Sequence, residues 1–143
     1  MTRLVFLIKS CSLVFALLSG SCVYAETNKA PSADDVKKGK PLYETHCMTC
    51  HQKNGVGQPT IPWGIRSLTY FPAMPLNETS HAWHHSDEQL QQRILKGIKN
   101  RMPAFQSTLT EQQAAYLVAY IKSLWSAEII ACQGPKHMSC MRH

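Results

Sequence analysis

The sequence predicts one small all-α domain. Three stretches of the 143-residue chain carry helix-capping residues or repeat apolar residues at helical spacing, and they cover about residues 33–47, 87–97 and 111–126. The stretches between them are rich in proline, glycine and asparagine, which favour turns and irregular backbone. No strand-rich segment precedes or separates these helices, so we expect helices joined by loops.

The first 25 residues have the pattern of a secretory signal peptide. A short basic start leads into the apolar residues 13–18, and Val23-Tyr24-Ala25 is a small-residue cleavage site. Because the apolar run is too short to cross a bilayer, we expect no stable membrane insertion. A lipoprotein anchor at Cys22 is the alternative interpretation. The polar residues 26–32 would then form a flexible lead-in.

The first expected helix begins near Ser32 or Asp34 and runs to the region of Cys47. Acidic residues in its first turn are favourable at the positive end of the helix dipole. Pro41 complicates this element, because a proline inside a helix removes a hydrogen bond and bends the axis. Gly39 has no side chain, so a second helix could approach closely at that point.

Directly after this helix comes Cys47-Met48-Thr49-Cys50-His51, the attachment sequence for c-type haem. Each thiol can add to one vinyl group of the porphyrin, and the spacing lets one helical turn present both sulfurs to the same ring. His51 would lie beneath the ring with a nitrogen directed at the iron. The motif therefore predicts one covalently attached haem c, held through Cys47 and Cys50.

Two other interpretations of the cysteine pair fit less well. A thioredoxin-like redox pair is expected near a βαβ pattern, which is missing here. A zinc site built from cysteines would need a second close pair, but Cys132 and Cys140 have seven residues between them. Export also agrees with haem attachment, because thioether formation takes place outside the bacterial cytoplasm.

The chain after His51 has the composition of a loop. Residues 52–59 contain the turn-forming sequence Asn54-Gly55-Val56-Gly57, and residues 58–79 hold four prolines with several aromatic residues among them. We expect irregular backbone wrapped over the haem edge. Trp63, Arg66 and the later Trp83 are candidates for contacts with the haem propionates, although a core or surface role explains them as well.

Two further helices are expected. The first begins at Ser86 or Asp87 and ends near Gly97, and Thr110 opens the second, over residues 111–126, with a capping box whose other member is Gln113. The apolar positions of the two helices are Leu90, Ile94, Leu95 and Ile98, then Leu117, Val118, Tyr120, Ile121, Leu124 and Trp125. The aromatic residues of the last helix would suit packing across residues 39–43.

The group that fills the second axial position decides whether a haem iron transfers electrons or binds small molecules. We predict Met102, because Pro103 biases it towards extended backbone, from which a loop can aim the thioether at the iron. A methionine can also simply fill a gap in the core. The competing ligands are Met74, which is also followed by proline, and the three histidines of one segment: His81, His84 and His85.

With the haem motif, Arg101-Met102-Pro103-Ala104-Phe105 and Ala119-Tyr120-Ile121-Lys122-Ser123-Leu124-Trp125 in place, residues 33–126 resemble a mono-haem class I c-type cytochrome. The resemblance implies a small helical fold around a buried haem, thioethers at Cys47 and Cys50, and axial ligation by His51 and Met102. It also implies that a proline carbonyl orients the His51 ring, a role that both Pro59 and Pro62 suit.

Residues 127–143 form an extension beyond this resemblance. In an oxidising compartment Cys132 and Cys140 would most simply form a disulfide. A copper site is the alternative, because cysteine, methionine and histidine suit Cu(I) and the tail crowds them together. The other candidate copper ligands there are His137, Met138, Met141 and His143.

These observations predict a periplasmic one-electron carrier, free or as the cytochrome partner of an oxidoreductase. Its partners would be redox proteins: a donor dehydrogenase or reductase, and an acceptor oxidase or carrier. No acid–base pair, nucleophile or phosphate loop suggests an enzyme, and scattered basic residues without interleaved aromatic ones do not suggest nucleic acid. The alternative is a binding module, either a haem-based gas sensor or a copper carrier. The oligomeric state is left open.

Overall fold

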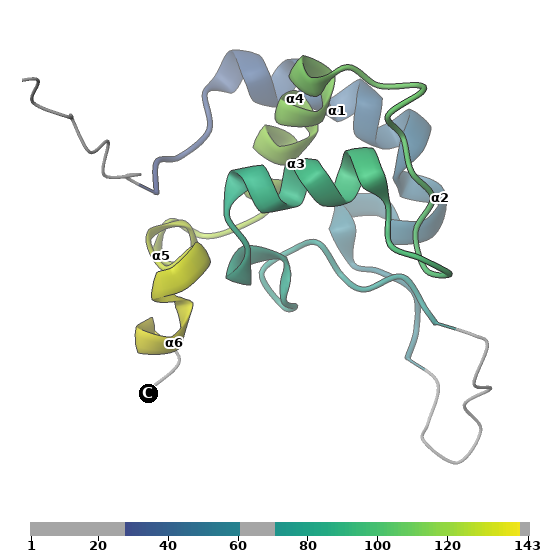
Figure 1. Cartoon of the computed structure of the whole chain (residues 1–143). Helices are drawn as coiled ribbons and strands as arrows, with labels where there is room; N and C mark the ends of the chain where they lie inside the picture. The colour runs from purple at the N-terminus through teal and green to yellow at the C-terminus, as the bar shows by residue number, and fades with distance from the viewer. Residues whose placement is uncertain (1–27, 61–70, 141–143) are drawn as a thin grey trace, which may run out of the picture.

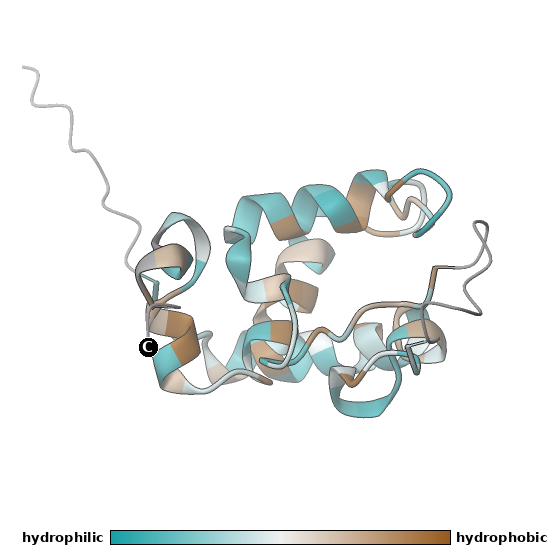
Figure 2. Ribbon diagram, turned by 90° about the horizontal axis from the view of Figure 1, so that it is seen from below, coloured by the Kyte–Doolittle hydropathy of each residue, from teal (hydrophilic) through white to brown (hydrophobic). Residues whose placement is uncertain are grey.

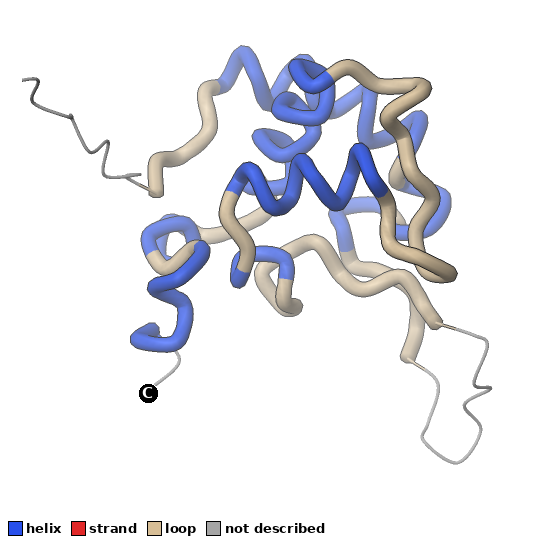
Figure 3. The backbone as a smooth tube through the Cα atoms, viewed as in Figure 1, coloured by secondary structure: helices blue, strands red, loops and turns tan. Residues whose placement is uncertain are grey.

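The computed structural model describes residues 28–60 and 71–140. Its elements, in chain order, are α1 (Ala33–His46), α2 (Met48–His51), η1 (Lys53–Gly55), η3 (Ala82–His84), α3 (Asp87–Lys96), α4 (Glu111–Lys122), α5 (Ala127–Ala131), η4 (Gly134–Lys136) and α6 (His137–Cys140). These residues form helices and loops without a β-strand, and the pairing of Ile98 with Met102 is an isolated bridge (Figure 3). The all-α prediction is confirmed.

The helix α1 forms where it was expected. The hydroxyl of Ser32 accepts a hydrogen bond from the backbone N–H of Asp35 at 3.1 Å, and so caps the helix. Pro41 lies inside α1, yet the helix continues through it to His46. The helix reaches the region of Cys47 as predicted, and it runs directly into the haem motif.

The helices α1 and α4 pack against each other (Figure 1), and Gly39 lies at their closest approach, beside Tyr116 and Tyr120. A Cβ atom at Gly39 would overlap the backbone carbonyl of Tyr116, so the crossing has room only for glycine. One turn further along, the rings of Tyr43 and Tyr120 lie 4.9 Å apart between their centroids. The predicted packing of the last helix across residues 39–43 is confirmed. With Tyr43 of α1, the apolar face of α4 supplies the most deeply buried residues of the core: Ala114, Leu117, Val118 and Ile121.

The helix α3 lies against α4 and buries Leu90 and Ile94, while hydrophilic residues cover most of its surface (Figure 2). Ser86 and Gln89 form a complete capping box at its start. Gly97 ends it with a φ of +69°, in the left-handed region that favours glycine. Both ends of this helix match the prediction.

The last predicted helix is shorter than expected. Thr110 and Gln113 form the predicted capping box, but α4 ends at Lys122 and not at residue 126. Ser126 adopts extended backbone and accepts a hydrogen bond from the N–H of Ile129, so it caps the next helix, α5. One residue cannot both continue a helix and cap its successor, because a cap needs non-helical backbone.

The C-terminal extension packs back onto the domain. Gln133 is 2% exposed, and its side-chain amide donates to the carbonyl of His85 at 2.9 Å and to the carboxylate of Asp87 at 2.7 Å. The same carboxylate accepts both contacts of the buried Lys122 ammonium, at 2.9 and 3.0 Å. A disulfide joins Cys132 to Cys140. The described part of the tail is thus tied to α3 and α4.

Candidate haem-binding site

One helical turn carries the two cysteines of the motif. Cys47 precedes α2, and its carbonyl accepts hydrogen bonds from the N–H groups of Cys50 (3.1 Å) and His51 (2.8 Å). Residues three apart on a helical turn point to the same side, so both sulfurs can reach one planar group. Neither sulfur is part of a disulfide: Cys47 is buried and Cys50 is exposed. Burial raises the pKa of the Cys47 thiol to about 11, and the neighbouring Cys50 adds to the shift.

The ring of His51 is oriented by one backbone hydrogen bond. Its Nδ1 lies 2.8 Å from the carbonyl oxygen of Met74, which can only accept, so Nδ1 carries the proton. This tautomer leaves the Nε2 lone pair available for a metal. Burial lowers the pKa of His51, against the opposing effect of the same hydrogen bond, so the ring stays neutral at neutral pH.

The carbonyl that orients His51 in the described residues differs from those of the two prolines that the resemblance favoured. The carbonyl at His51 belongs to Met74, while Pro59 lies on the exposed loop after the motif and Pro62 lies outside the described residues. The Nδ1–H group donates one hydrogen bond, and Met74 already accepts it. Met74 precedes a proline, Pro75, but the identity of these two residues does not predict that the Met74 carbonyl accepts a hydrogen bond from His51.

A short pairing of two loops holds Met74 at that place. The backbone N–H of Gln58 donates to the carbonyl of Ala73 at 2.9 Å, and the N–H of Leu76 donates to the carbonyl of Gly55 at 2.7 Å. Between them, Gly57 has a φ of +73°, and a Cβ there would lie 2.6 Å from the nitrogen of Pro75. Gly55 and Gly57, which the sequence predicts to lie in a loop, thus let that loop approach the segment that orients His51.

Met102 lies in the loop between α3 and α4. Its N–H and carbonyl both pair with Ile98, at 2.9 Å each, and the residue is half-buried against the core. Phe105, three residues on, contacts the ring of His46 edge-on with centroids 5.9 Å apart, directly before the haem motif. The guanidinium of Arg101 lies 4.3 Å from the ring centre of Phe71. The methionine loop therefore borders both the motif and the segment that leads to Met74.

Comparison with known families decides the class of this site. Residues 34–121 match the model of the family described as cytochrome c oxidase, cbb3-type, subunit III, which covers more than half of the chain. The chain belongs to this family of class I c-type cytochromes. No solved structure matches it. The cytochrome binds one c-type haem, and its domain serves electron transfer through that haem.

The described residues offer the haem suitable partners. Besides the two thiols and the free Nε2 of His51, the cytochrome has two buried polar groups that find no hydrogen-bond partner within its described part: Trp83 Nε1 and Ser80 Oγ. Buried donors of this kind are normally satisfied, so a carboxylate supplied by a propionate would complete them. The predicted candidates Trp63 and Arg66 lie outside the described residues.

The remaining candidate ligands lie elsewhere. His81, His84 and His85 lie in or beside the short helix η3, where His84 contacts both His81 and His137 of the tail. In that tail the Cys132–Cys140 disulfide occupies both sulfurs that a copper site would have used as thiolates. The haem motif and the histidine cluster are thus formed by different segments of the cytochrome.

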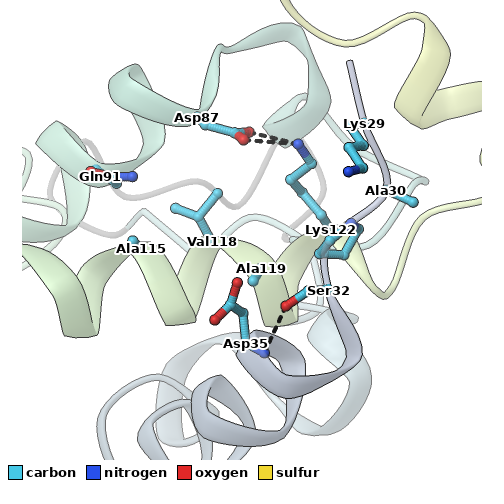
Figure 4. A pocket seen from close by; sticks show the side chains of 11 residues that line it. Lys29, Ala30, Ser32, Asp35, Asp87, Gln91, Ala115, Val118, Ala119 and Lys122 are labelled. Atoms are coloured by element: carbon cyan, nitrogen blue, oxygen red, sulfur yellow. Dashed lines mark hydrogen bonds and ion pairs between the residues drawn. The ribbon is translucent and has the colours of Figure 1, made fainter. Parts of the chain in front are cut away.

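A cleft between the start of α1 and the helices α3 and α4 has a structural role (Figure 4). Across it, the ammonium of Lys122 meets the carboxylate of Asp87, and beside it Ser32 caps α1 through Asp35. None of the residues that line it belongs to the haem motif. Within the described ranges, no helix is both long and apolar enough to cross a membrane.

Proposed function

We propose that the protein is a periplasmic one-electron carrier with His51 and Met102 as the axial ligands of its haem and Cys47 and Cys50 as the thioether positions. The observation that carries this proposal is the hydrogen bond from His51 Nδ1 to the Met74 carbonyl. It selects the tautomer that can ligate iron and restrains the ring, as expected of a permanent ligand. The signal-like leader at residues 1–25 supports export.

The same hydrogen bond favours Met102 over Met74 as the second ligand. Met74 contacts Nδ1, the nitrogen that does not bind iron, so its backbone would lie on the same side of a bound haem as His51. The Met74 side chain is also 51% exposed, whereas Met102 is half-buried against the core. A thioether is short, and it cannot reach around the porphyrin to the opposite face.

The bound haem supplies a one-electron couple, and the chain's own residues keep that couple stable. His51 and Met102 together would fill both axial positions, so electron transfer would need little rearrangement and small molecules would not bind. Thioether sulfur is a soft donor, and Met102 would favour the ferrous state relative to a second histidine. The protein itself makes and breaks no bonds. Redox proteins would dock transiently, through the small interfaces typical of electron transfer.

The decisive experiment compares Met102→Ala with Met74→Ala in the matured holoprotein. The resemblance to class I cytochromes associates methionine ligation with a weak far-red band in the oxidised spectrum. We expect Met102→Ala to lose this band, bind carbon monoxide when reduced, and have a lower reduction potential, while Met74→Ala keeps all three properties of the parent.

Other outcomes would identify a different function. A native protein that is high-spin, or that binds carbon monoxide promptly when reduced, would have an open site and act as a haem-based sensor. If only Met74→Ala lost the far-red band, Met74 would be the axial ligand in place of Met102. If the mass of matured protein lacked the added haem, the proposal of a covalent attachment at Cys47 and Cys50 would be wrong.

A further inference from the structure

Two imidazoles converge beside η3, outside the haem motif. The Nδ1 atoms of His81 and His84 lie 3.4 Å apart, and their rings are nearly perpendicular, at 80°. The turn that carries them is closed by a hydrogen bond from the N–H of His84 to the carbonyl of His81, at 3.1 Å. This bond fixes the backbone from which both imidazoles project, and the electron-transfer function gives their convergence no role.

This separation matches the bite of a divalent transition metal. Zinc binds imidazole nitrogen at about 2.0–2.1 Å, and two such bonds at a tetrahedral angle place the nitrogens about 3.3–3.4 Å apart. We propose that His81 and His84 chelate a borderline divalent cation, Zn²⁺ or Cu²⁺, through their Nδ1 atoms. The metal replaces the proton now shared between these atoms, and that proton moves to Nε2 of the donating ring, so no net proton release is required.

The ring of His84 is held in place before any metal binds. The indole of buried Trp83 meets it edge-on, with centroids 4.2 Å apart, and the ring of His137 stacks on it at 4.3 Å and 18°. His137 is itself fixed, because its Nδ1 donates to the carbonyl of Gly134 at 2.7 Å. The C-terminal extension thus supplies a stacking partner to the chelate. A ring already in its bound orientation loses little entropy on ligation.

The site has two protein ligands, with water completing the coordination. No three histidine, cysteine or acidic side chains in the described ranges are arranged to hold a metal ion together. His81 is exposed and His84 is half-buried, so solvent and a cation can reach the two nitrogens. Such an open site should bind Cu²⁺ more tightly than Zn²⁺, according to the Irving–Williams order, and should exchange readily.

The test titrates the oxidised holoprotein with Zn²⁺ by calorimetry and with Cu²⁺ by electron paramagnetic resonance. We expect one site per chain, nitrogen hyperfine structure from two imidazoles, and at least tenfold weaker binding in His81→Gln and in His84→Gln. The matched control is His85→Gln, which removes the adjacent imidazole and should leave the affinity unchanged. His137→Ala should weaken binding by a smaller factor, because it removes only the stacking partner.

The haem spectrum serves as the check on folding, and it separates this site from the iron. It should stay the same in all four variants and during the titration. Unchanged affinity in the His81→Gln, His84→Gln double variant would overturn the proposal. So would a loss of binding in His85→Gln, or a titration in which the added metal changes the axial ligation of the haem.

Discussion

The backbone of Gly97 lies against the carbonyl of Met102: a Cβ built on Gly97 would lie 2.6 Å from that oxygen and 2.8 Å from the carbonyl carbon of Pro103. Gly97 also has a φ of +69° where α3 ends. The end of one helix therefore sets the path of the loop that carries the proposed axial methionine.

Gly97→Ala should consequently disturb the haem more than it disturbs the fold. The added methyl group must push the segment 102–104 away, so we expect a weaker far-red band and a lower reduction potential. Gly134→Ala is the matched control, because Gly134 also has a positive φ, of +74°, but its Cβ would be 3.9 Å from the nearest atoms, those of Ser86. Both variants should lose about 1–3 kcal/mol because an alanine side chain disfavours backbone with a positive φ. An unchanged far-red band in Gly97→Ala would contradict this role.

Gly39→Ala should destabilise the whole domain. The new Cβ would overlap the carbonyl of Tyr116, and the rigid helices α1 and α4 can relieve that overlap only by moving apart. Overpacking of this kind costs about 1–3 kcal/mol of the free energy of unfolding, measured by denaturant titration of the holoprotein. Lys40→Ala, at the exposed neighbouring position, should change it by less than about 0.5 kcal/mol. Equal effects in the two variants would show that the crossing tolerates a methyl group.

The Lys122–Asp87 pair should respond differently according to which partner is removed. The Lys122 side chain is 6% exposed and that of Asp87 is 38% exposed. Asp87→Ala leaves the enclosed ammonium without its counter-ion, and we expect a loss of about 2–3 kcal/mol, less than for a fully buried pair because water reaches Asp87. Lys122→Met removes the charge and keeps the apolar stem, so it should cost less. A larger loss in Lys122→Met would mean that the ion pair itself contributes most of the stability.

Gln133→Ala should loosen the tail while the haem site stays intact. The side chain donates two partly buried hydrogen bonds, to His85 and Asp87. The carbonyl of His85 is left unpaired by the substitution, at a cost of about 1–3 kcal/mol, whereas the carboxylate of Asp87 keeps its contacts with Lys122. We expect faster amide hydrogen exchange in α5 and α6, with an unchanged haem spectrum. Gln92→Ala on the exposed face of α3 should leave exchange as it is. Unchanged amide hydrogen exchange in Gln133→Ala would show that other contacts hold the tail on the domain.

Local chemistry made the helices predictable. Ser32, Ser86 and Thr110 cap their helices through bonds to residues three positions away, so the signal lies within four consecutive letters. The crossing at Gly39 was predictable for a similar reason, since a glycine in a helix lets a second helix pack closely against it. The end of α4 was not, because Ser126 acts as a cap only when the residues after it, 127–131, form a helix of their own.

The haem motif was predictable from its spacing, whereas the orientation of His51 was not. The orienting group is a backbone carbonyl 23 residues away, and carbonyls are the same in every residue type. Long-range contacts of the tail escaped prediction in the same way. Gln133 reaches Asp87 across 46 residues, and His137 stacks on His84, although nothing in either segment points to the other.

The bond between Cys132 and Cys140 has a consequence for maturation. On the proposed attachment, Cys47 and Cys50 must remain thiols until the haem arrives, while the other two cysteines are oxidised in the same chain. The reductant that keeps Cys47 and Cys50 as thiols must therefore leave the Cys132–Cys140 disulfide intact. Thiol–disulfide exchange requires access to the sulfur, so it should begin at Cys50, which is exposed, while Cys47 is buried and Cys132 and Cys140 are half-covered by their own folded tail.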